Sequence, residues 1–563
     1  MDALLTQELS HFIIGTLVGK LIHLNVFIRR EWHKSAPTIF ILHASSAMIL
    51  LIARCLVADD EAMKMVTGTT MVFLGYITGL MTNMTLYRVY FHPLANHGFK
   101  GPRYAGMTKL WHSWAARDGQ NHLLLESLRH QYGDFVRTGP AELTVFHPAA
   151  LAAINGPKST CIKGEWYDIF YPNMQSIVTC RDKADHAAHR REWNRAFLPD
   201  ALAHYGDVFS NNLEALEVYL DSCAKDNQPC EMRDLLLWFS FDVMGELVFS
   251  TSFGMVRNKT WHPIVRHVKE GLHLIGLLSA VPWLTQIGFR LAPPVSIIRN
   301  WHGLVDYCKN IIHQRIEKNT NGQAGHDFMH YMLLQQERFG DNGGPSWLVG
   351  DTLMMLVAGR QVRYSRPSLI PHLFGTSMLF ILYNLVNHPH HAELIYHEIE
   401  GIDIDDNKAL SQLSHLNAVI NESSRLGPSI PTGGNRKTGP MGLMIGQTYI
   451  PPETTIVAPR YSIFRREDCF EKADQFIPER WTTRPEMVRD STAFKPFGMG
   501  DTSCLGRTLS LRILRRVIAQ LVKKYEFRFA PGEIGCHVYG DLADHFSATP
   551  GQLHLCVKIR EQQ

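Results

Sequence analysis

A glycine-rich loop that carries one cysteine and leads directly into an amphipathic segment constrains this chain most. The stretch runs from Ala493 to Phe527. Apolar residues recur at helical spacing in its second half, with Arg and Lys between them, which predicts a helix from about Gly506. Cys504 stands two residues before that start, where unpaired backbone N–H groups and the positive end of the helix dipole favour a thiolate. Although a lone cysteine is more often a small buried hydrophobe, this loop suits a metal-bound thiolate.

Four residues of this loop form a recognisable pattern. Phe497, Gly500, Cys504 and Gly506 resemble the F-x-x-G-x-x-x-C-x-G haem loop of the cytochrome P450 family. The resemblance implies that Cys504 ligates the iron of haem b and that the other three residues lie against the cofactor. Glycine there would let the backbone lie close beneath a planar ligand. Thr502 departs from the family, which often has at this position an Arg that contacts a haem propionate.

A charged triad forms a second matching pattern. Residues 413–426 have helical periodicity, and Glu422 and Arg425 are three positions apart, so they share one helix face. The pair coincides with the family's E-x-x-R motif, and a later P-E-R segment supplies Arg480. The resemblance implies that the three charges are buried together behind the haem loop. Mutation of any of them should then abolish haem incorporation.

Positive residues that could neutralise the haem propionates occur in two places. Arg436 follows Arg425 at an interval typical of a propionate-binding arginine in the family. Residues 186–197 form a basic, predicted helical segment around Trp193, which on its own could be an ordinary solvated helix face. Because the family's W-x-x-x-R spacing is absent, the contact stays open among Arg190, Arg191 and Arg195, and Arg191 is taken as the candidate.

Composition and order set the fold class. Among 563 residues, 56 Lys and Arg stand against 53 Asp and Glu, so no strong net charge points to nucleic acid. The ten cysteines show no C-x-x-C pairs, which disfavours a zinc ribbon or a disulfide scaffold. Residues 132–148 alternate around a Gly-Pro turn, as in a β-hairpin, and residues 201–340 suggest a series of amphipathic helices. We expect a mainly α cytochrome P450 fold with a smaller β region.

Three apolar stretches precede this domain, each near the ~20 residues that cross a bilayer. They are Phe12–Ile28, Thr38–Val57 and Val66–Leu86. The first ten residues contain acids and no Lys or Arg, which argues against a cleaved signal peptide.

Loop charges predict the orientation of these spans. Basic residues follow the first span and acidic residues 59–61 follow the second, so the first loop should be cytosolic and the second lumenal. Arg54 is the one charge against this orientation. The N-terminus would be lumenal, and the catalytic domain would face the cytosol from the endoplasmic reticulum membrane.

A Pro- and Gly-containing segment joins the two parts. Residues 87–103 contain Pro93 and Pro102 and predict a stiff, non-helical hinge. They also resemble the Y-R-x-Y-F-H-P-L segment of fungal microsomal members of the family. We therefore divide the chain into an anchor at 1–90, a hinge at 91–105 and a haem-binding domain at 106–563.

The helix that crosses the distal face of the haem departs from the family pattern. Ala358 and Gly359 match the start of the A-G-x-D/E-T signature, whose acid and alcohol relay protons to bound oxygen, and they mark this helix. Residues 360–377 then diverge and include Pro367 and Pro371, which disfavour a helix interior. The stretch is either a gene-model artefact, such as a retained intron, or a divergent helix. Ser365 and Thr376 are weak substitutes for the missing alcohol.

A histidine-rich stretch at residues 387–399 suggests a metal site at first sight. His388, His390 and His391 flank a proline at a predicted helix start. No cysteine or regular carboxylate pattern nearby completes a ligand set. A solvated surface is the favoured interpretation from sequence.

The resemblance implies haem-thiolate monooxygenation of an apolar secondary metabolite, as in fungal enzymes that oxidise prenylated indole alkaloids. Electrons would come from NADPH through a membrane-bound cytochrome P450 reductase, and membrane lipid would hold the anchor. Basic residues on the predicted helix after Cys504 could steer the reductase, or form an ordinary solvated face; they are Arg507, Arg512, Arg515, Arg516, Lys523 and Lys524. Alternatives are an isomerase or dehydratase that needs no O2, and a chain made non-functional by residues 360–377.

Overall fold

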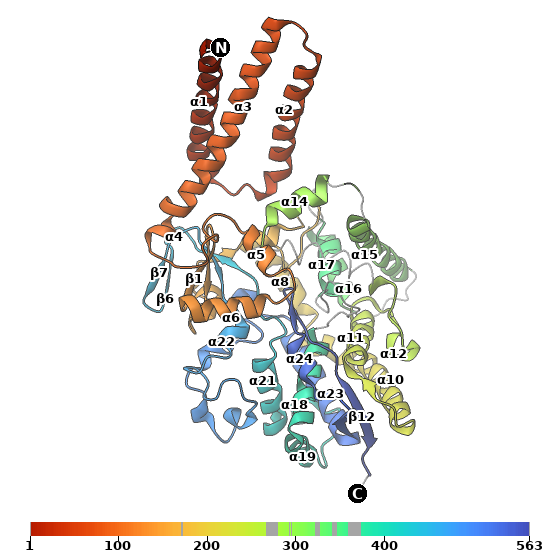
Figure 1. Ribbon diagram of the computed structural model, residues 1–563. Helices are drawn as coiled ribbons and strands as arrows, with labels where there is room; N and C mark the ends of the chain where they lie inside the picture. Colours follow the sequence, from red (N-terminus) through yellow and green to blue (C-terminus); the bar gives the residue numbers. More distant parts are fainter. Residues whose placement is uncertain are drawn as a thin grey trace.

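The computed structural model describes residues 2–170, 173–265, 280–291, 293, 296–320, 327–339, 346–357 and 373–561. Three long helices at the N-terminus project from a helical domain that holds small sheets (Figure 1). Ala358 and Gly359, with most of the divergent stretch, lie outside the described residues.

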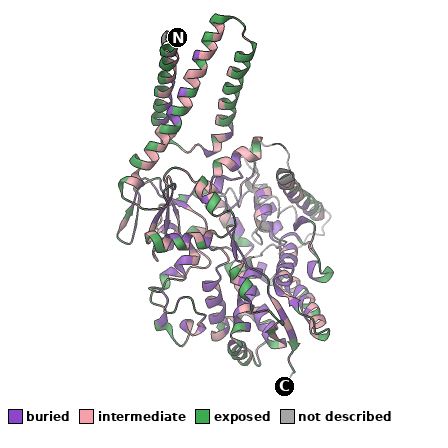
Figure 2. Cartoon of the chain, in the orientation of Figure 1, coloured by how far each residue is buried: buried purple, intermediate pink, exposed green. Residues whose placement is uncertain are grey.

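The three N-terminal helices are each long and apolar enough to cross a membrane. They are α1 (Asp2–Asn25), α2 (Ala36–Leu56) and α3 (Asp60–Leu86). Many large apolar side chains on them are exposed, and exposed positions follow these helices along their length (Figure 2), whereas the much longer domain exposes such side chains at scattered positions. Exposed apolar surface of this extent is what a membrane anchor requires.

Two small-residue motifs pack α1 against α3. Gly15 and Gly19 on α1, and Gly75 and Gly79 on α3, are each four residues apart. A Cβ at Gly75 would come within 2.1 Å of the Phe12 carbonyl oxygen, and one at Gly19 within 2.2 Å of the Tyr76 oxygen. The close approach of the two backbones follows from the absence of side chains, as in paired G-x-x-x-G helices of membrane proteins.

The predicted non-helical hinge is wrong in part. Tyr87–Phe91 (η3) continues α3 as a π-helix, and α4 (Pro93–Asn96) is a further helical turn. Pro93 occupies the first turn of α4, where its missing N–H costs no hydrogen bond. His92 caps that turn, because its Nδ1 accepts from the Leu94 N–H at 3.2 Å. Beyond Asn96 the segment is irregular up to residue 109.

The larger sheet has the strand order β1-β2-β8-β5-β3. Its strands are β1 (Phe135–Gly139), β2 (Glu142–Val145), β3 (Ile162–Lys163), β5 (Arg436–Lys437) and β8 (Thr455–Val457). The predicted hairpin is confirmed as the antiparallel pair of β1 and β2. β3 pairs with β5 so that Lys163 lies opposite Arg436, which brings two basic side chains together from distant parts of the sequence.

Smaller sheets lie elsewhere in the domain. One joins β4 (Cys230–Glu231), β12 (His554–Ile559) and β9 (Tyr525–Phe529); the others pair β6 (Leu443–Ile445) with β7 (Thr448–Ile450) and β10 (Ala543–Asp544) with β11 (Ala548–Thr549).

Helices make up the rest of the domain and enclose one large apolar core. The longer ones are α6 (Asn121–Tyr132), α8 (Lys183–Arg195), α10 (Gly206–Lys225), α11 (Met232–Phe249), α14 (Pro282–Leu291), α15 (Ser296–Thr320), α16 (Phe328–Phe339), α17 (Trp347–Val357), α18 (Leu373–Asn387), α19 (Pro389–Glu398), α21 (Ser414–Leu426) and α23 (Arg507–Lys524). Ile513, Val517 and Leu521 of α23 are buried, as their spacing predicted. α18 begins at Leu373, inside the stretch 360–377 that diverges from the family pattern, because Phe374 packs into the core and outweighs the low helix propensity of Gly375.

Candidate active site

The loop around Cys504 adopts a conformation that requires glycine at two positions. Gly498 and Gly500 have positive φ angles of 68° and 65°, a region that other residues rarely adopt. A Cβ at Gly500 would also come within 2.1 Å of the Asn155 carbonyl oxygen. The Cys504 N–H donates to the Phe497 carbonyl at 2.8 Å and so closes the loop. The predicted helix follows as α23, with Gly506 at its N-cap.

The Cys504 thiol is less ready to ionise than its position before a helix suggested. The side chain is accessible, yet protein atoms surround it closely, and this burial raises the pKa of the Cys504 thiol. The Gly506 N–H and the Arg190 guanidinium act in the opposite direction but do not outweigh burial. The Gly506 N–H thus acts in the direction that the position before a helix predicts, and a bound metal cation would add to it in favour of the thiolate.

Arg436 reaches the cysteine loop from the larger sheet. Its Nη2 donates to Thr502 Oγ1 at 3.0 Å, and its Nη1 donates to the Tyr167 hydroxyl at 2.9 Å. Arg436 is buried and forms no ion pair with a described residue. Thr502, the residue that departs from the family pattern, thus holds this arginine in place.

The basic segment before Trp193 is confirmed as helix α8, and one of its arginines faces the loop. Arg190 donates from Nη2 to Ser503 Oγ at 3.0 Å. Arg191 is exposed, and Arg195 is exposed and pairs with Glu192 at 3.0 Å. Of the three arginines that the sequence left open, Arg190 is therefore the one that we carry forward.

A buried group of cations surrounds the same space. Lys163 donates from Nζ to the Ile177 carbonyl at 2.9 Å, and burial, together with nearby Arg436, lowers its pKa to about 7. Burial also lowers the pKa of Arg460 to about 10, and its Nε has no hydrogen-bond partner among described residues. Neither side chain forms an ion pair within the part of the chain described here. An anion at this place would compensate them.

Glu422, Arg425 and Arg480 form a fully buried triad. The side chains of Glu422, Arg425 and Arg480 are 0% exposed. Glu422 accepts from Arg425 Nη2 at 2.8 Å and from Arg480 Nε at 3.0 Å. It also accepts from the Ile477 N–H at 3.0 Å and Trp481 Nε1 at 2.9 Å. The remaining arginine N–H groups donate to backbone carbonyls of residues 464–475, so the triad joins α21 to that segment and to η5 (Pro478–Trp481).

On α17, a buried carboxyl lies seven residues before Ala358. Asp351 accepts from the Ile177 N–H at 2.8 Å and from Trp193 Nε1 at 3.2 Å. Burial raises the pKa of Asp351 to about 7. Thr376, one proposed substitute alcohol, is buried on α18 and donates to the Ala548 carbonyl at 3.4 Å. Ser365 lies outside the described residues.

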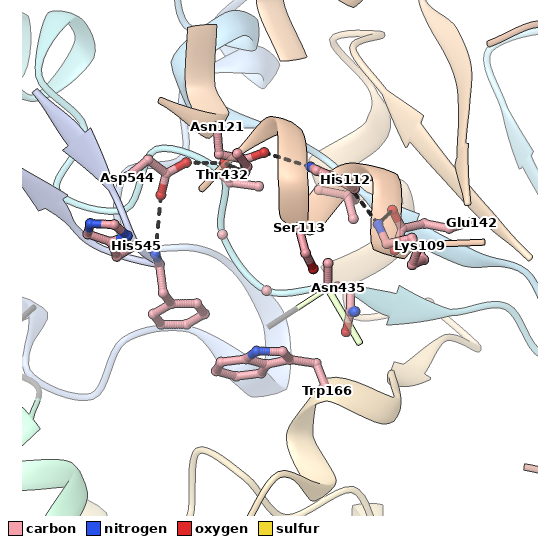
Figure 3. A pocket seen from close by; sticks show the side chains of 16 residues that line it. Lys109, His112, Ser113, Asn121, Glu142, Trp166, Thr432, Asn435, Asp544 and His545 are labelled. Atoms are coloured by element: carbon pink, nitrogen blue, oxygen red, sulfur yellow. Dashed lines mark hydrogen bonds and ion pairs between the residues drawn. The ribbon is translucent and has the colours of Figure 1, made fainter. Parts of the chain in front are cut away.

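A cleft opens beside the strand that carries Arg436. Its lining includes residues 432–435, Trp166 and Phe546 (Figure 3). The Trp166 and Phe546 rings stack with their centroids 4.8 Å apart. On the other wall, His112 Nε2 lies 2.7 Å from Asn121 Oδ1, and Asn121 Nδ2 donates to Thr432 Oγ1 at 3.0 Å. The cleft therefore combines an aromatic surface with a hydrogen-bonded polar wall.

Sequence reasoning missed several of these groups. Tyr167, Lys163, Asp351 and Arg460 come from segments without a recognisable motif, and only the β3–β5 pairing and the contact of α17 with residue 177 bring them together. The one signal in the sequence was a single charged residue among apolar neighbours, as at Asp351.

The residues present fit a planar group with two carboxylates. Arg436 and Arg190 approach the cysteine loop from different elements, and neither forms an ion pair with a described residue. The orphaned Arg460 Nε and the buried Lys163 add positive charge. The Cys504 thiol would supply the iron ligand, and Gly498 and Gly500 allow the positive φ angles of the loop. This donor set matches haem with an axial thiolate.

Comparison with known proteins decides the family. The family model described as "Cytochrome P450" matches residues 103–361 and 374–557. The chain belongs to the cytochrome P450 family. The match omits residues 362–373, which lie inside the divergent stretch.

Its relatives include fungal cytochrome P450 monooxygenases. The monooxygenase phqL of Penicillium fellutanum is 31% identical, with 99% of this chain and 96% of that protein covered. Tryprostatin B 6-hydroxylase of Aspergillus fumigatus is 30% identical, with 89% and 87% covered. The crystal structure of the cytochrome P450DA haem domain superposes with a TM-score of 0.63 at 15% identity, covering 79% of this chain and 94% of that one. The P450 fold and the monooxygenase class are thereby confirmed, and the family implies a haem-thiolate iron.

Proposed function

We propose that this P450 monooxygenase hydroxylates an apolar secondary metabolite, with Cys504 as the iron ligand. Bound haem would activate O2 with two electrons, so that one oxygen atom enters the substrate and the other becomes water. The observation that carries the proposal is the convergence of Arg436 and Arg190, neither of which forms an ion pair with a described residue, on the loop of an accessible cysteine.

Each of these residues has a separate task. Arg436 and Arg190 neutralise the haem propionates, and Thr502 and Ser503 orient the two guanidinium groups. The triad of Glu422, Arg425 and Arg480 fixes the segment behind the cysteine loop and does not touch substrate. Phe497, Gly500 and Gly506 shape the loop itself.

The substrate proposal rests on the cleft and on the relatives. Stacked Trp166 and Phe546 offer a flat apolar surface of the kind that aromatic ligands contact. Residues 432–435, which line the cleft, directly precede Arg436 in the chain. Tryprostatin B 6-hydroxylase, by its name, hydroxylates tryprostatin B. From the aromatic surface of the cleft we assign a hydrophobic, aromatic metabolite to this chain.

We place the protein in the endoplasmic reticulum membrane with its catalytic domain in the cytosol. Glu31, in the loop between α1 and α2, accepts from Arg181 at 2.7 Å and from Lys437 at 2.7 Å. This loop therefore lies on the same side of the membrane as the catalytic domain. The positive charges of the loop favour the cytosol for both.

Electrons would come from an NADPH–cytochrome P450 reductase, although the basic surface is smaller than its sequence suggested. Arg516 pairs with Asp405, and Lys524 pairs with Glu217 at 2.8 Å. Arg507 and Lys523 remain exposed on α23. Electrostatic steering of an acidic reductase would then depend on few basic side chains. Added salt should therefore slow the reduction of the haem iron only modestly.

The divergent residues 360–377 leave two alternatives, because they stand where the family has the turn that activates oxygen. An isomerase or dehydratase that needs neither O2 nor NADPH, or an inactive chain, would follow. Incubation of the holoenzyme with reductase, NADPH, labelled O2 and a panel of indole alkaloids separates these cases. Our proposal requires NADPH-dependent product with one labelled oxygen. Product formed without NADPH would support the isomerase, and haem-loaded protein without any product would support the inactive chain.

A further inference from the structure

The histidine-rich start of α19 acquires partners in the fold that sequence reasoning did not find. His391 is buried, and its Nδ1 lies 3.1 Å from Nε2 of His415 on α21. The same Nδ1 lies 3.9 Å from Oε1 of Glu479 in η5. His390 joins them, since ligand atoms of His390, His391 and Glu479 all lie within 4.8 Å of one another. Three segments that are remote in sequence therefore converge.

We propose that His390, His391 and Glu479 bind a zinc ion and that His415, whose Nε2 lies 3.1 Å from His391 Nδ1, completes the ligand set. Imidazole nitrogens and a carboxylate oxygen are the donors that zinc takes in proteins. Two nitrogens that ligate one tetrahedral zinc at about 2.0–2.1 Å lie roughly 3.3 Å apart, close to the separation of the His391 and His415 nitrogens. The site holds no cysteine, so its affinity depends on these four groups alone.

Neighbouring residues hold the ligands in position. Phe476 packs edge-to-face on the His391 ring at a centroid distance of 5.4 Å. The Glu398 carboxylate accepts from the backbone N–H groups of His415 and Leu416, at 2.8 and 2.9 Å, and so fixes the start of α21. Such outer contacts orient ligands before the metal arrives.

The crowding of imidazoles favours a metal over protons. The rings of His390 and His391 have centroids 3.9 Å apart, and His391 also stacks with His415 at 5.1 Å. Protonation of more than one ring would bring like charges together. A divalent ion binds the neutral rings and brings Glu479 into the same shell.

A second cluster of potential ligands does not compete. Glu31, His33 and Asp168 also lie within 4.8 Å of one another. Their carboxylates are already paired, Glu31 with Arg181 and Lys437, and Asp168 with Lys34 at 3.1 Å. Cations of the protein itself therefore occupy that place.

The proposed site acts on the scaffold of the haem domain. Glu479 directly precedes Arg480, whose Nε donates to Glu422. His415 is on the same helix, α21, as Glu422. Zinc would thus join α19 to the two segments that the buried triad connects, at the end of the molecule remote from α1–α3 (Figure 1). Binding should therefore raise the thermal midpoint of the domain.

The test uses the full-length holoenzyme, treated with a chelator and desalted. Zinc binding is measured by titration calorimetry and by metal content after dialysis, and haem content reports folding. We expect one zinc per chain, and at least about tenfold weaker binding in His415→Gln and Glu479→Gln. His397→Gln is the matched control, because His397 is exposed on the same helix and contacts Glu400. It should bind zinc like the natural chain.

Two results would overturn the proposal. One is the absence of zinc binding in the natural chain at concentrations that saturate ordinary zinc sites. The other is equal affinity in the control and the site variants. If His415→Gln loses haem, His390→Gln decides, because His390 is exposed. A His390→Gln variant that keeps haem but loses zinc binding supports the site. Unchanged zinc binding in that variant contradicts the site.

Discussion

Replacement of Glu422 by Gln should destabilise the haem domain severely. The carboxylate is the only acidic group in a fully buried triad, and it accepts five hydrogen bonds from two arginines, a tryptophan and a backbone N–H. The substitution leaves both guanidinium groups buried without a counter-charge. Removing one partner of a buried ion pair costs about 3–5 kcal/mol, a large part of the roughly 5–15 kcal/mol that stabilises a typical domain.

Haem content per chain and the midpoint of urea unfolding measure this effect. We expect Glu422→Gln to accumulate poorly and to carry little haem. Glu486→Gln is the matched control, because Glu486 is exposed in the turn after the triad segment and undergoes the same loss of charge. The reasoning is refuted if Glu422→Gln keeps the haem content and, within about 1 kcal/mol, the unfolding free energy of the natural chain.

Three further substitutions test separate parts of the account. Arg436→Leu should lower haem occupancy at least several-fold in purified protein, whereas Leu at exposed Arg484 should not; equal occupancy would remove Arg436 from the propionate site. Burial raises the pKa of Asp351 to about 7, from about 3.8 in the unfolded chain. Unfolding therefore releases a proton between these pH values, and the contribution of Asp351 to the free energy of unfolding falls by up to about 1.4 kcal/mol per pH unit as pH rises from about 4 to about 7. In Asp351→Asn that slope should vanish from urea unfolding measured across this range, and an unchanged slope would contradict the assignment. Arg181 and Lys437 hold the pKa of Glu31 at about 2, so its contacts stabilise the docked loop above about pH 4.5 and are lost as pH falls towards 2. Glu31→Gln should speed amide exchange of residues 26–35 by about 5–30-fold, equivalent to about 1–2 kcal/mol, and no change would mean that the loop is held by other contacts.

Local patterns explain what the sequence could predict. The cysteine loop, the E-x-x-R pair and the three apolar helices each depend on residues that are close in sequence, so their spacing is informative. Cys504 before α23 and Glu422 beside Arg425 were found in this way. Arg480 came only from the family resemblance, because no periodicity links it to α21.

Contacts between distant segments explain what the sequence could not predict. The choice of Arg190 over Arg191 depends on the rotation of α8 against the cysteine loop, and one position changes the face by about 100°. His415 and Glu479 join His391 only through packing of α19, α21 and η5. The thiol pKa depends on burial, which local charge reasoning did not include.

The reading of prolines illustrates the same limit. Pro93 was taken as a helix breaker, yet at the first turn of a new helix it is favourable. The paired glycines of α1 and α3, by contrast, form two G-x-x-x-G motifs that are visible in the sequence itself.

The central claim is that Cys504 ligates a haem iron in the chain as it stands, with residues 360–377 present. The carbon monoxide difference spectrum of the reduced full-length protein tests it most directly, with Cys504→Ala measured beside it. We predict a thiolate-type Soret band in the natural chain and its loss in the variant. Absence of the band in well-expressed natural protein, or its persistence in Cys504→Ala, would contradict the account.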